Sequence, residues 1–204
     1  MIKADELNFE KLGGLIPAVV SDSDTNQVLM LGFMNEEALA KTIETKRVTF
    51  FSRSRNTLWM KGETSGNFLN LIDIKKDCDS DSLLLFAKPD GPTCHKGTYS
   101  CFGIEKNNSH FIDQLSKLIK ERKKNLPENS YTTKLFKEGA DRIIQKVGEE
   151  AIETVIAAKN RDKEEIINET SDLIYHLLVM LAEQEIEFEE VIDKLIARHK
   201  VKSK

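Results

Sequence analysis

Three cysteines form the first group of residues whose types could do chemistry. Cys78 lies in the acidic run of residues 77–81, and Cys94 and Cys101 follow with six residues between them. Three thiols suit Zn²⁺ with a fourth position left for water, the arrangement of a hydrolytic site, and the metal would lower the pKa of that water toward about 7. His95, next to a thiol, is then a candidate general base. The alternative is three unrelated thiols in a core, where free cysteine is often found.

Three aspartates, Asp77, Asp79 and Asp81, alternate along the acidic run. In an extended segment they share one face, and Cys78 points the other way. Crowded carboxylates repel one another, and hard oxygen ligands favour Mg²⁺ or Ca²⁺. The run indicates either a divalent-cation site or a solvated turn between strands. If Cys78 faces away from the acids, the two metal sites draw on different chains of a dimer.

Cations and hydroxyls that suit a phosphate lie in two short segments, residues 52–55 and 61–67. Guanidinium groups bind phosphate in a bidentate manner, and the glycines of the second segment allow the backbone to approach a ligand. Each segment taken alone also fits an ordinary hairpin turn. We predict the substrate-binding residues here to be Arg53, Arg55, Lys61, Thr64 and Ser65.

Five carboxylates in the C-terminal part have helical spacing: Glu149, Glu150, Glu153, and then Glu169 and Asp172. At about 100° per residue, the members on each helix fall on one arc. Acids at the inner edge of a helical bundle are costly to desolvate unless they are paired or bind a metal. Such acids on one helix are more often a solvated surface, but the second acidic pair favours a site. The chemistry that fits is Mg²⁺ bridging a polyphosphate and an attacking water.

The neighbours of these acids predict which side of the helix is buried. Ile152, Val155 and Ile156 fall beside the acidic arc, so we expect the acids to border a buried apolar stripe. Lys146 falls inside the arc, and we assign it to substrate binding. We interpret His176, on the second helix, as a buried or supporting histidine and not as a base.

The two groups of candidate residues lie on parts of different texture. Residues 1–107 contain all three cysteines and predict short strands at 47–52, 57–60, 68–74 and 82–87, with one helix after Asn35. Residues 108–204 predict helices at 111–124, 131–159, 163–184 and 188–199. Residues 104–110 are a polar linker. We therefore predict an α+β protein, with a strand-rich mixed domain over 1–107 and an all-α bundle over 108–204.

Composition excludes several classes of partner. The 204 residues carry 30 Lys and Arg against 34 Asp and Glu, a net charge of −4, which argues against nucleic acid or a membrane surface. The apolar run at 173–182 is too short to span a bilayer. The N-terminus lacks a signal-peptide layout, and the odd number of cysteines fits a reducing compartment. We expect a soluble, cytoplasmic protein.

Five motifs in the N-terminal part together resemble phosphoribosyl-AMP cyclohydrolase, the histidine-pathway enzyme that opens the adenine ring by hydrolysis. They are Leu31-Gly-Phe-Met-Asn35, Phe51-Ser-Arg-Ser-Arg55, Leu58-Trp-Met-Lys-Gly-Glu-Thr-Ser-Gly-Asn67, Asp77-Cys-Asp-Ser-Asp81 and Gly91-Pro-Thr-Cys-His95 with Ser100-Cys-Phe102. The resemblance implies a homodimer whose zinc site spans the subunits. It implies Zn²⁺ on Cys78, Cys94 and Cys101, and Mg²⁺ on Asp77, Asp79 and Asp81.

Residues 146–159 and 169–178 resemble phosphoribosyl-ATP pyrophosphohydrolase, one of the all-α NTP pyrophosphohydrolases. The acidic pattern of that class, Glu-Glu-x-x-Glu followed by Glu-x-x-Asp, is complete here. The resemblance implies Mg²⁺ ligands at Glu149, Glu150, Glu153, Glu169 and Asp172. We assign Glu150 to catalysis in this domain, as we assign His95 in the other.

Two families that catalyse consecutive steps indicate a bifunctional hydrolase of histidine biosynthesis that acts on phosphorylated nucleotides. The helical domain would release pyrophosphate from phosphoribosyl-ATP, and the N-terminal domain would open the ring of phosphoribosyl-AMP. One alternative is a zinc-dependent nucleotide deaminase, although the Pro-Cys-x-x-Cys signature is absent. Another is a metal-stabilised nucleotide-binding module whose helices serve only for dimerisation.

Overall fold

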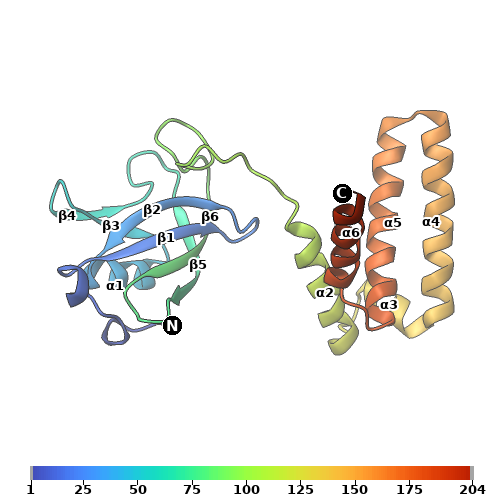
Figure 1. Cartoon of the computed structure of the whole chain (residues 1–204), viewed down its shortest axis with the longest axis horizontal. Coiled ribbons are helices and arrows are strands. Elements are labelled where there is room, and N and C mark those ends of the chain that lie inside the picture. Colours follow the sequence, from blue (N-terminus) through green and yellow to red (C-terminus); the bar gives the residue numbers. More distant parts are fainter. Residues whose placement is uncertain (1, 203–204) are drawn as a thin grey trace. The chain divides into compact units, whose positions relative to one another are not determined.

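Two compact units make up the chain, Met1–Phe111 and Ile112–Lys204. The computed structural model describes residues 2–202. The first unit contains strands and one α-helix of ten residues, and the second contains helices (Figure 1). The predicted α+β class, strand-rich first and helical second, is confirmed. Within residues 2–202, no helix is both long and apolar enough to cross a membrane.

A four-stranded sheet in the order β2-β1-β6-β5 is the centre of the first unit (Figure 1). β1 (Ile16–Asp22) and β2 (Val28–Met34) form an antiparallel hairpin that the sequence analysis did not predict. β1 also pairs in parallel with β6 (Leu83–Pro89), which pairs in antiparallel fashion with β5 (Leu69–Lys76). Alternate side chains of β1 are therefore fully buried in the core.

A second hairpin, β3 (Thr49–Ser52) with β4 (Thr57–Met60), lies beside this sheet. α1 (Glu36–Thr45) begins after Asn35, whose side-chain oxygen accepts the Ala38 N–H at 2.8 Å, which confirms the predicted cap. Phe50 of β3 packs so closely on β2 that a Cβ at Gly32 would meet its ring at 2.3 Å. A glycine at that position allows the hairpin to contact the sheet.

The described part of the second unit consists of five helices: α2 (Phe111–Asn125), α3 (Tyr131–Glu138), α4 (Ala140–Asn160), α5 (Lys163–Glu183) and α6 (Phe188–Lys202). α4 and α5 run side by side (Figure 1) and are joined by a tight turn at Arg161 and Asp162. The Asp162 carboxylate accepts the N–H groups of Glu164 and Glu165, so it caps α5. The core is built from apolar residues of α2, α3, α4 and α5.

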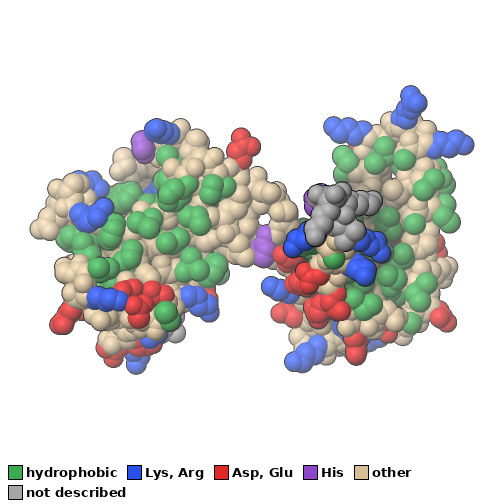
Figure 2. Space-filling model, viewed as in Figure 1, with side chains coloured by type: hydrophobic (Ala, Val, Ile, Leu, Met, Phe, Trp, Pro, Cys, Tyr) green, Lys and Arg blue, Asp and Glu red, His purple; other side chains and the backbone are tan. Residues whose placement is uncertain are grey.

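Two predictions for this unit are wrong. The run 131–159 is two helices, because Gly139 adopts φ 92° and ψ 178° between α3 and α4. The stripe beside the acids is also not buried, since the exposed fractions of Ile152, Val155 and Ile156 are 64%, 67% and 51%. Figure 2 shows hydrophobic side chains on the surface of the helical unit. Helical periodicity located the stripe correctly, but it does not tell which face of the helix another helix covers.

The break at Gly139 predicts opposite effects for two glycine substitutions. Gly139→Ala should lower the free energy of unfolding of the helical unit by about 1–3 kcal/mol, because its backbone conformation is one that essentially only glycine adopts. Gly148→Ala, inside α4 with no heavy atom near its Cβ position, should raise it by about 1 kcal/mol. Urea unfolding followed by circular dichroism measures both effects.

The fluorescence of Trp59, the only tryptophan of the chain, reports on the other unit in the same titration. Its unfolding transition should not move in either variant. Equal stability of Gly139→Ala and the parent protein would contradict the explanation of the helix break.

Candidate active sites

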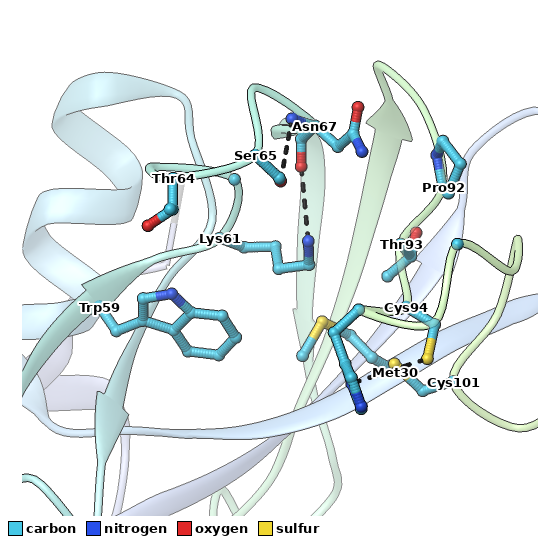
Figure 3. Close-up of a pocket in the computed structure, with 13 residues that line it drawn as sticks. Met30, Trp59, Lys61, Thr64, Ser65, Asn67, Pro92, Thr93, Cys94 and Cys101 are labelled. Carbon is cyan, nitrogen blue, oxygen red and sulfur yellow. Dashed lines mark hydrogen bonds between the residues drawn. The ribbon is translucent and has the colours of Figure 1, made fainter.

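Side chains from β2, β4 and two loops surround a pocket of about 310 Å³ in the first unit (Figure 3). Cys94 and Cys101 lie next to each other in it, and the Cys94 Sγ is 3.9 Å from the His95 Nδ1. The loop that carries both thiols is fixed at its end, because the Cys101 N–H donates to the Leu29 carbonyl of β2 at 2.8 Å. The pocket therefore holds two of the three predicted zinc ligands and the predicted base.

The two thiols have different electrostatic surroundings. The backbone N–H of Lys96 stabilises the Cys94 thiolate and lowers the pKa of that thiol. Partial burial raises the pKa of the Cys101 thiol, and the neighbouring Cys94 adds to that increase. Burial lowers the pKa of Lys61, an effect that both thiols partly offset. A buried ammonium beside two thiols favours an anionic ligand in the pocket.

The predicted phosphate-binding residues separate into two groups. Lys61, Thr64 and Ser65 line the pocket, and the Lys61 Nζ donates to the Asn67 carbonyl at 3.5 Å (Figure 3). Arg53 and Arg55 do not line it. Their guanidinium carbons lie 3.8 Å from the centre of the Phe33 ring and 6.0 Å from that of Trp59.

Three further lining residues, Trp59, Asn67 and Thr93, were not assigned to the site by sequence reasoning. Thr93 is buried, and its hydroxyl has no hydrogen-bond partner among the described residues. Its position before Cys94 was a usable signal, but burial of the hydroxyl is decided by packing and is not visible in the sequence.

Residues 77–81 are part of a turn between β5 and β6 and not an extended segment, so the argument from alternate facing is wrong. Ser80 has a left-handed φ of 63°, and Asp77 accepts the N–H groups of Asp81 and Ser82 at 3.0 and 3.2 Å. The Ser82 hydroxyl also donates to Asp77 and lowers the pKa of that carboxyl to about 2. Cys78 is exposed on this turn and does not line the pocket of the other two thiols.

The turn nevertheless brings the predicted cation ligands together. One carboxylate oxygen each of Asp77, Asp79 and Asp81 lies within 4.8 Å of the others. Lys11 was not predicted to take part, yet its Nζ is 2.6 Å from an Asp79 oxygen and also contacts Asp81. These two carboxylates raise the pKa of Lys11. The Lys11 ammonium group therefore offsets the repulsion between the Asp79 and Asp81 carboxylates, as a bound metal cation would.

In the helical unit, Glu150, Glu169 and Asp172 bring one carboxylate oxygen each within 4.8 Å of the others. Glu150 is only 5% exposed, and the Lys146 Nζ lies 2.6 Å from its Oε1. Glu153 is exposed, and desolvation, followed by the negative charges of Glu150 and Glu169, raises the pKa of its carboxyl, so it senses the charge of this acidic cluster. Three of the five predicted ligands thus come together, with a fourth at the edge.

The Glu149 carboxylate, which is not one of the three clustered acids, is bound by three side-chain donors of its own helix. It accepts from Arg142 at 3.2 Å, from Gln145 at 2.8 Å and from Lys146 at 2.9 Å. These contacts lower the pKa of its carboxyl, with Lys146 making the largest contribution. Lys146 therefore bridges Glu149 and Glu150, as its place inside the predicted acidic arc suggested.

Two tyrosines complete a pocket of about 480 Å³ beside Glu150 and Asp172, and neither tyrosine was predicted from the sequence. It is lined by Tyr131, Lys146, Glu150, Asp172, Tyr175 and His176. The rings of Tyr131 and Tyr175 stack with centroids 6.3 Å apart. His176 is buried with its Nε2 3.9 Å from Glu150, and burial lowers its pKa. A neutral, buried imidazole fits the supporting role predicted for it.

The first unit has a thiol-lined pocket and the second has an acidic pocket, which are the two donor sets expected from the sequence for a hydrolase with two sites. Residues 30–103 match the family model for phosphoribosyl-AMP cyclohydrolase, and residues 112–199 match that for phosphoribosyl-ATP pyrophosphohydrolase. The chain belongs to the family of histidine biosynthesis bifunctional proteins, and it has both of these enzyme activities. The predicted family and the predicted enzyme activities are thereby confirmed.

Relatives with this domain arrangement match the chain over nearly its full length. The histidine biosynthesis bifunctional protein HisIE of Escherichia coli (strain K12) is 55% identical over 95% of this chain and 96% of its own. The protein of the same name from Campylobacter jejuni is 52% identical over 96% of each chain. That from Bacteroides thetaiotaomicron is 52% identical over 95% of this chain and 96% of its own.

The contact of Lys11 with two aspartates generates a prediction on metal binding. Lys11→Met should increase the affinity of the turn for Mg²⁺, because the ammonium group no longer competes for Asp79 and Asp81. Lys75→Met, which removes an ion pair with Asp73 of the same strand, β5, is the matched control and should leave the affinity unchanged. Calorimetric titration of both variants with Mg²⁺ gives the comparison. Weaker binding by Lys11→Met would show that the lysine supports the site and does not compete with the metal.

Proposed function

We propose that phosphoribosyl-ATP binds in the acidic pocket of the helical domain, 108–204, and that phosphoribosyl-AMP binds in the thiol pocket of domain 1–107. The observation that carries this assignment is the separation of donor types. The pocket of the first unit is lined by thiols and a buried lysine, and the pocket of the helical unit is lined by carboxylates and tyrosines. The aspartate cluster of the first unit lies on a turn outside the thiol pocket. Carboxylates suit Mg²⁺ and a polyphosphate, whereas thiolates suit Zn²⁺. The product of the helical domain would then be the substrate of the N-terminal domain.

In the thiol pocket, Cys94 and Cys101 fit a soft metal, and the exposed Cys78 of a second chain would complete the donor set in a homodimer. Zinc held there would lower the pKa of a water toward about 7 and so supply hydroxide for addition to the ring. His95, next to Cys94, would take the proton from that water. Addition across the purine N1–C6 bond followed by cleavage of that bond opens the ring.

The substrate phosphate in this domain is assigned to the cationic side of the pocket. Lys61 has its ammonium group inside, and the hydroxyls of Thr64 and Ser65 line the same wall. Arg53 lies over the Phe33 ring, and Arg55 lies near the ring of Trp59, which lines the pocket. Both would contact a part of the substrate that extends beyond the pocket. Mg²⁺ on Asp77, Asp79 and Asp81 is supported by their approach to one another and by the Lys11 ammonium beside them.

At the acidic pocket, Glu150, Glu169 and Asp172 would hold Mg²⁺, and Glu149 and Glu153 would add negative charge next to them. Mg²⁺ there would neutralise the polyphosphate and stabilise the charge that develops on the leaving pyrophosphate. Glu150, buried and fixed by Lys146, would orient the attacking water. Lys146 would turn from Glu149 toward a phosphate oxygen once substrate binds.

Separate sites predict that each activity can be removed alone. Loss of a group that merely supports a metal ligand lowers activity about 10- to 100-fold. Cys94→Ser removes a proposed ligand itself, so it should reduce the rate of ring opening about 100-fold or more, while pyrophosphate release continues. Glu150→Gln should reduce pyrophosphate release by a similar factor, while added phosphoribosyl-AMP is still consumed. The assays are pyrophosphate release and the ultraviolet change on ring opening, with bound zinc measured in each variant.

Lys159→Ala, an exposed position at the end of α4, is a control for both assays and should leave both rates unchanged. Loss of both activities in either single-site variant, in a protein that keeps its circular dichroism, would contradict the two-site assignment. Release of ammonia in place of simple ring opening would favour the deaminase.

A zinc site shared between chains predicts complementation. Cys78→Ser and Cys94→Ser subunits should each be nearly inactive in ring opening when alone. Mixed dimers of the two would contain one intact site out of two, so ring opening should recover to a substantial fraction of the parent rate. The measurement is activity after the two variants are co-expressed and the mixed species is purified by two different tags. No recovery would count against a shared site.

A further inference from the structure

A second pocket of the helical unit, of about 420 Å³, lies at the beginning of α3. It is lined by residues 127–131 of the α2–α3 connection and by Thr133, Lys134, Lys137 and Glu138. Tyr131 is the one residue that lines both this pocket and the acidic pocket. The other members of its lining have no role in the proposed reaction.

Hydrogen-bond donors converge at this pocket without a protein acceptor for all of them. The Ser130 Oγ accepts the Thr133 N–H at 3.3 Å, and the N–H groups of Tyr131 and Thr132, in the first turn, have no carbonyl acceptor within an α-helix. The Thr133 hydroxyl has no hydrogen-bond partner in the part of the chain that the structure describes, although Thr133 is only 3% exposed. A buried hydroxyl without a partner costs stability, so a ligand that pairs with it is favoured.

The charged side chains that line the pocket balance in number, so the preference for an anion comes from the beginning of α3. Lys134 and Lys137 contribute two cations, and Glu128 and Glu138 contribute two anions. Glu138 is compensated, because it lies 3.7 Å from Lys134 and 3.8 Å from Arg142. The N-terminus of α3 adds the positive end of its helix dipole, which stabilises a phosphate group by hydrogen bonds from the backbone.

We propose that this pocket binds a phosphate monoester, namely the 5-phosphate of the phosphoribosyl group on the substrate of the helical domain. The proposal rests on the proposed function, which puts the triphosphate arm of the same molecule in the acidic pocket. Tyr131 connects the two pockets, since its ring lies 6.3 Å from that of Tyr175 and 6.0 Å from that of His176. Two phosphate subsites on either side of a tyrosine would distinguish phosphoribosyl-ATP from ATP, which lacks the second arm.

The experiment compares Thr133→Val, which keeps the shape but removes the hydroxyl, with Thr133→Ser, which keeps the hydroxyl, in the full chain. The probe is ribose 5-phosphate, titrated by calorimetry without added metal. Thr133→Val should weaken the binding component of the helical domain about tenfold or more, and Thr133→Ser should restore it, as expected for a hydrogen bond to a charged group. Glu128→Gln should tighten this component, because it removes an anion from the pocket lining.

Kinetics supply a second readout. The KM for phosphoribosyl-ATP should rise in Thr133→Val while kcat at saturation is kept, the pattern of lost ground-state binding. Equal ribose 5-phosphate affinity in Thr133→Val, Thr133→Ser and the parent would overturn the proposal. So would a change in tripolyphosphate affinity in place of ribose 5-phosphate affinity, since the pocket would then take the other arm. Glu150→Gln should keep ribose 5-phosphate binding, so failure of the subsite is distinct from failure of the catalytic assignment.

Discussion

Carboxylates held within a few ångströms of one another repel, and both units of this chain contain such a cluster together with a lysine that lies against it. In the helical unit Lys146 contacts Glu149 and Glu150 from the preceding turn of the same helix. In the strand-rich unit Lys11 reaches Asp79 and Asp81 from a distant part of the sequence. The lysine compensates the charge when no other cation is bound, so the acids can stay in place and the surrounding fold need not rearrange when a metal enters. Charge balance therefore helps to fix the turn between β5 and β6 and the pairing of α4 with α5. The packing of the two cores also contributes.

Local signals in the sequence were sufficient wherever local contacts decide the structure. The Asn35 cap of α1, the strand at residues 57–60, the helical spacing of the acids and the place of Lys146 among them all depend on residues within one or two turns. The thiol, aspartate and glutamate motifs also carried enough information to identify both enzyme families. The same local spacing placed Glu149 among the predicted ligands, and the sequence did not show that three neighbouring donors bind its carboxylate.

Features that depend on distant contacts were missed or predicted wrongly, for identifiable reasons. β1 pairs in parallel with β6, and the order of strands in a sheet is not written in either segment alone. The turn at residues 77–82 folds back through the left-handed Ser80, so the alternation expected of an extended chain does not apply. Gly139 ends one helix and begins the next within a continuous amphipathic pattern, because hydrophobic spacing on both sides of it is helical. The buried hydroxyls of Thr93 and Thr133 became visible only once their surroundings were packed.

The polar segment between the two units has a consequence for the supply of enzyme to the pathway. Gln27 fixes the start of this segment, since its side chain bonds the Glu105 carbonyl and the Asn107 N–H, and the chain then continues into the helical unit. Because one polypeptide carries both units, synthesis always delivers the two activities in equal molar amounts, and degradation of an unfolded helical unit removes its partner activity as well. The flux through the two steps therefore cannot be balanced by expressing more of one enzyme. It can be balanced only by the turnover rates of the two sites, so selection on either pocket also acts on the output of the other.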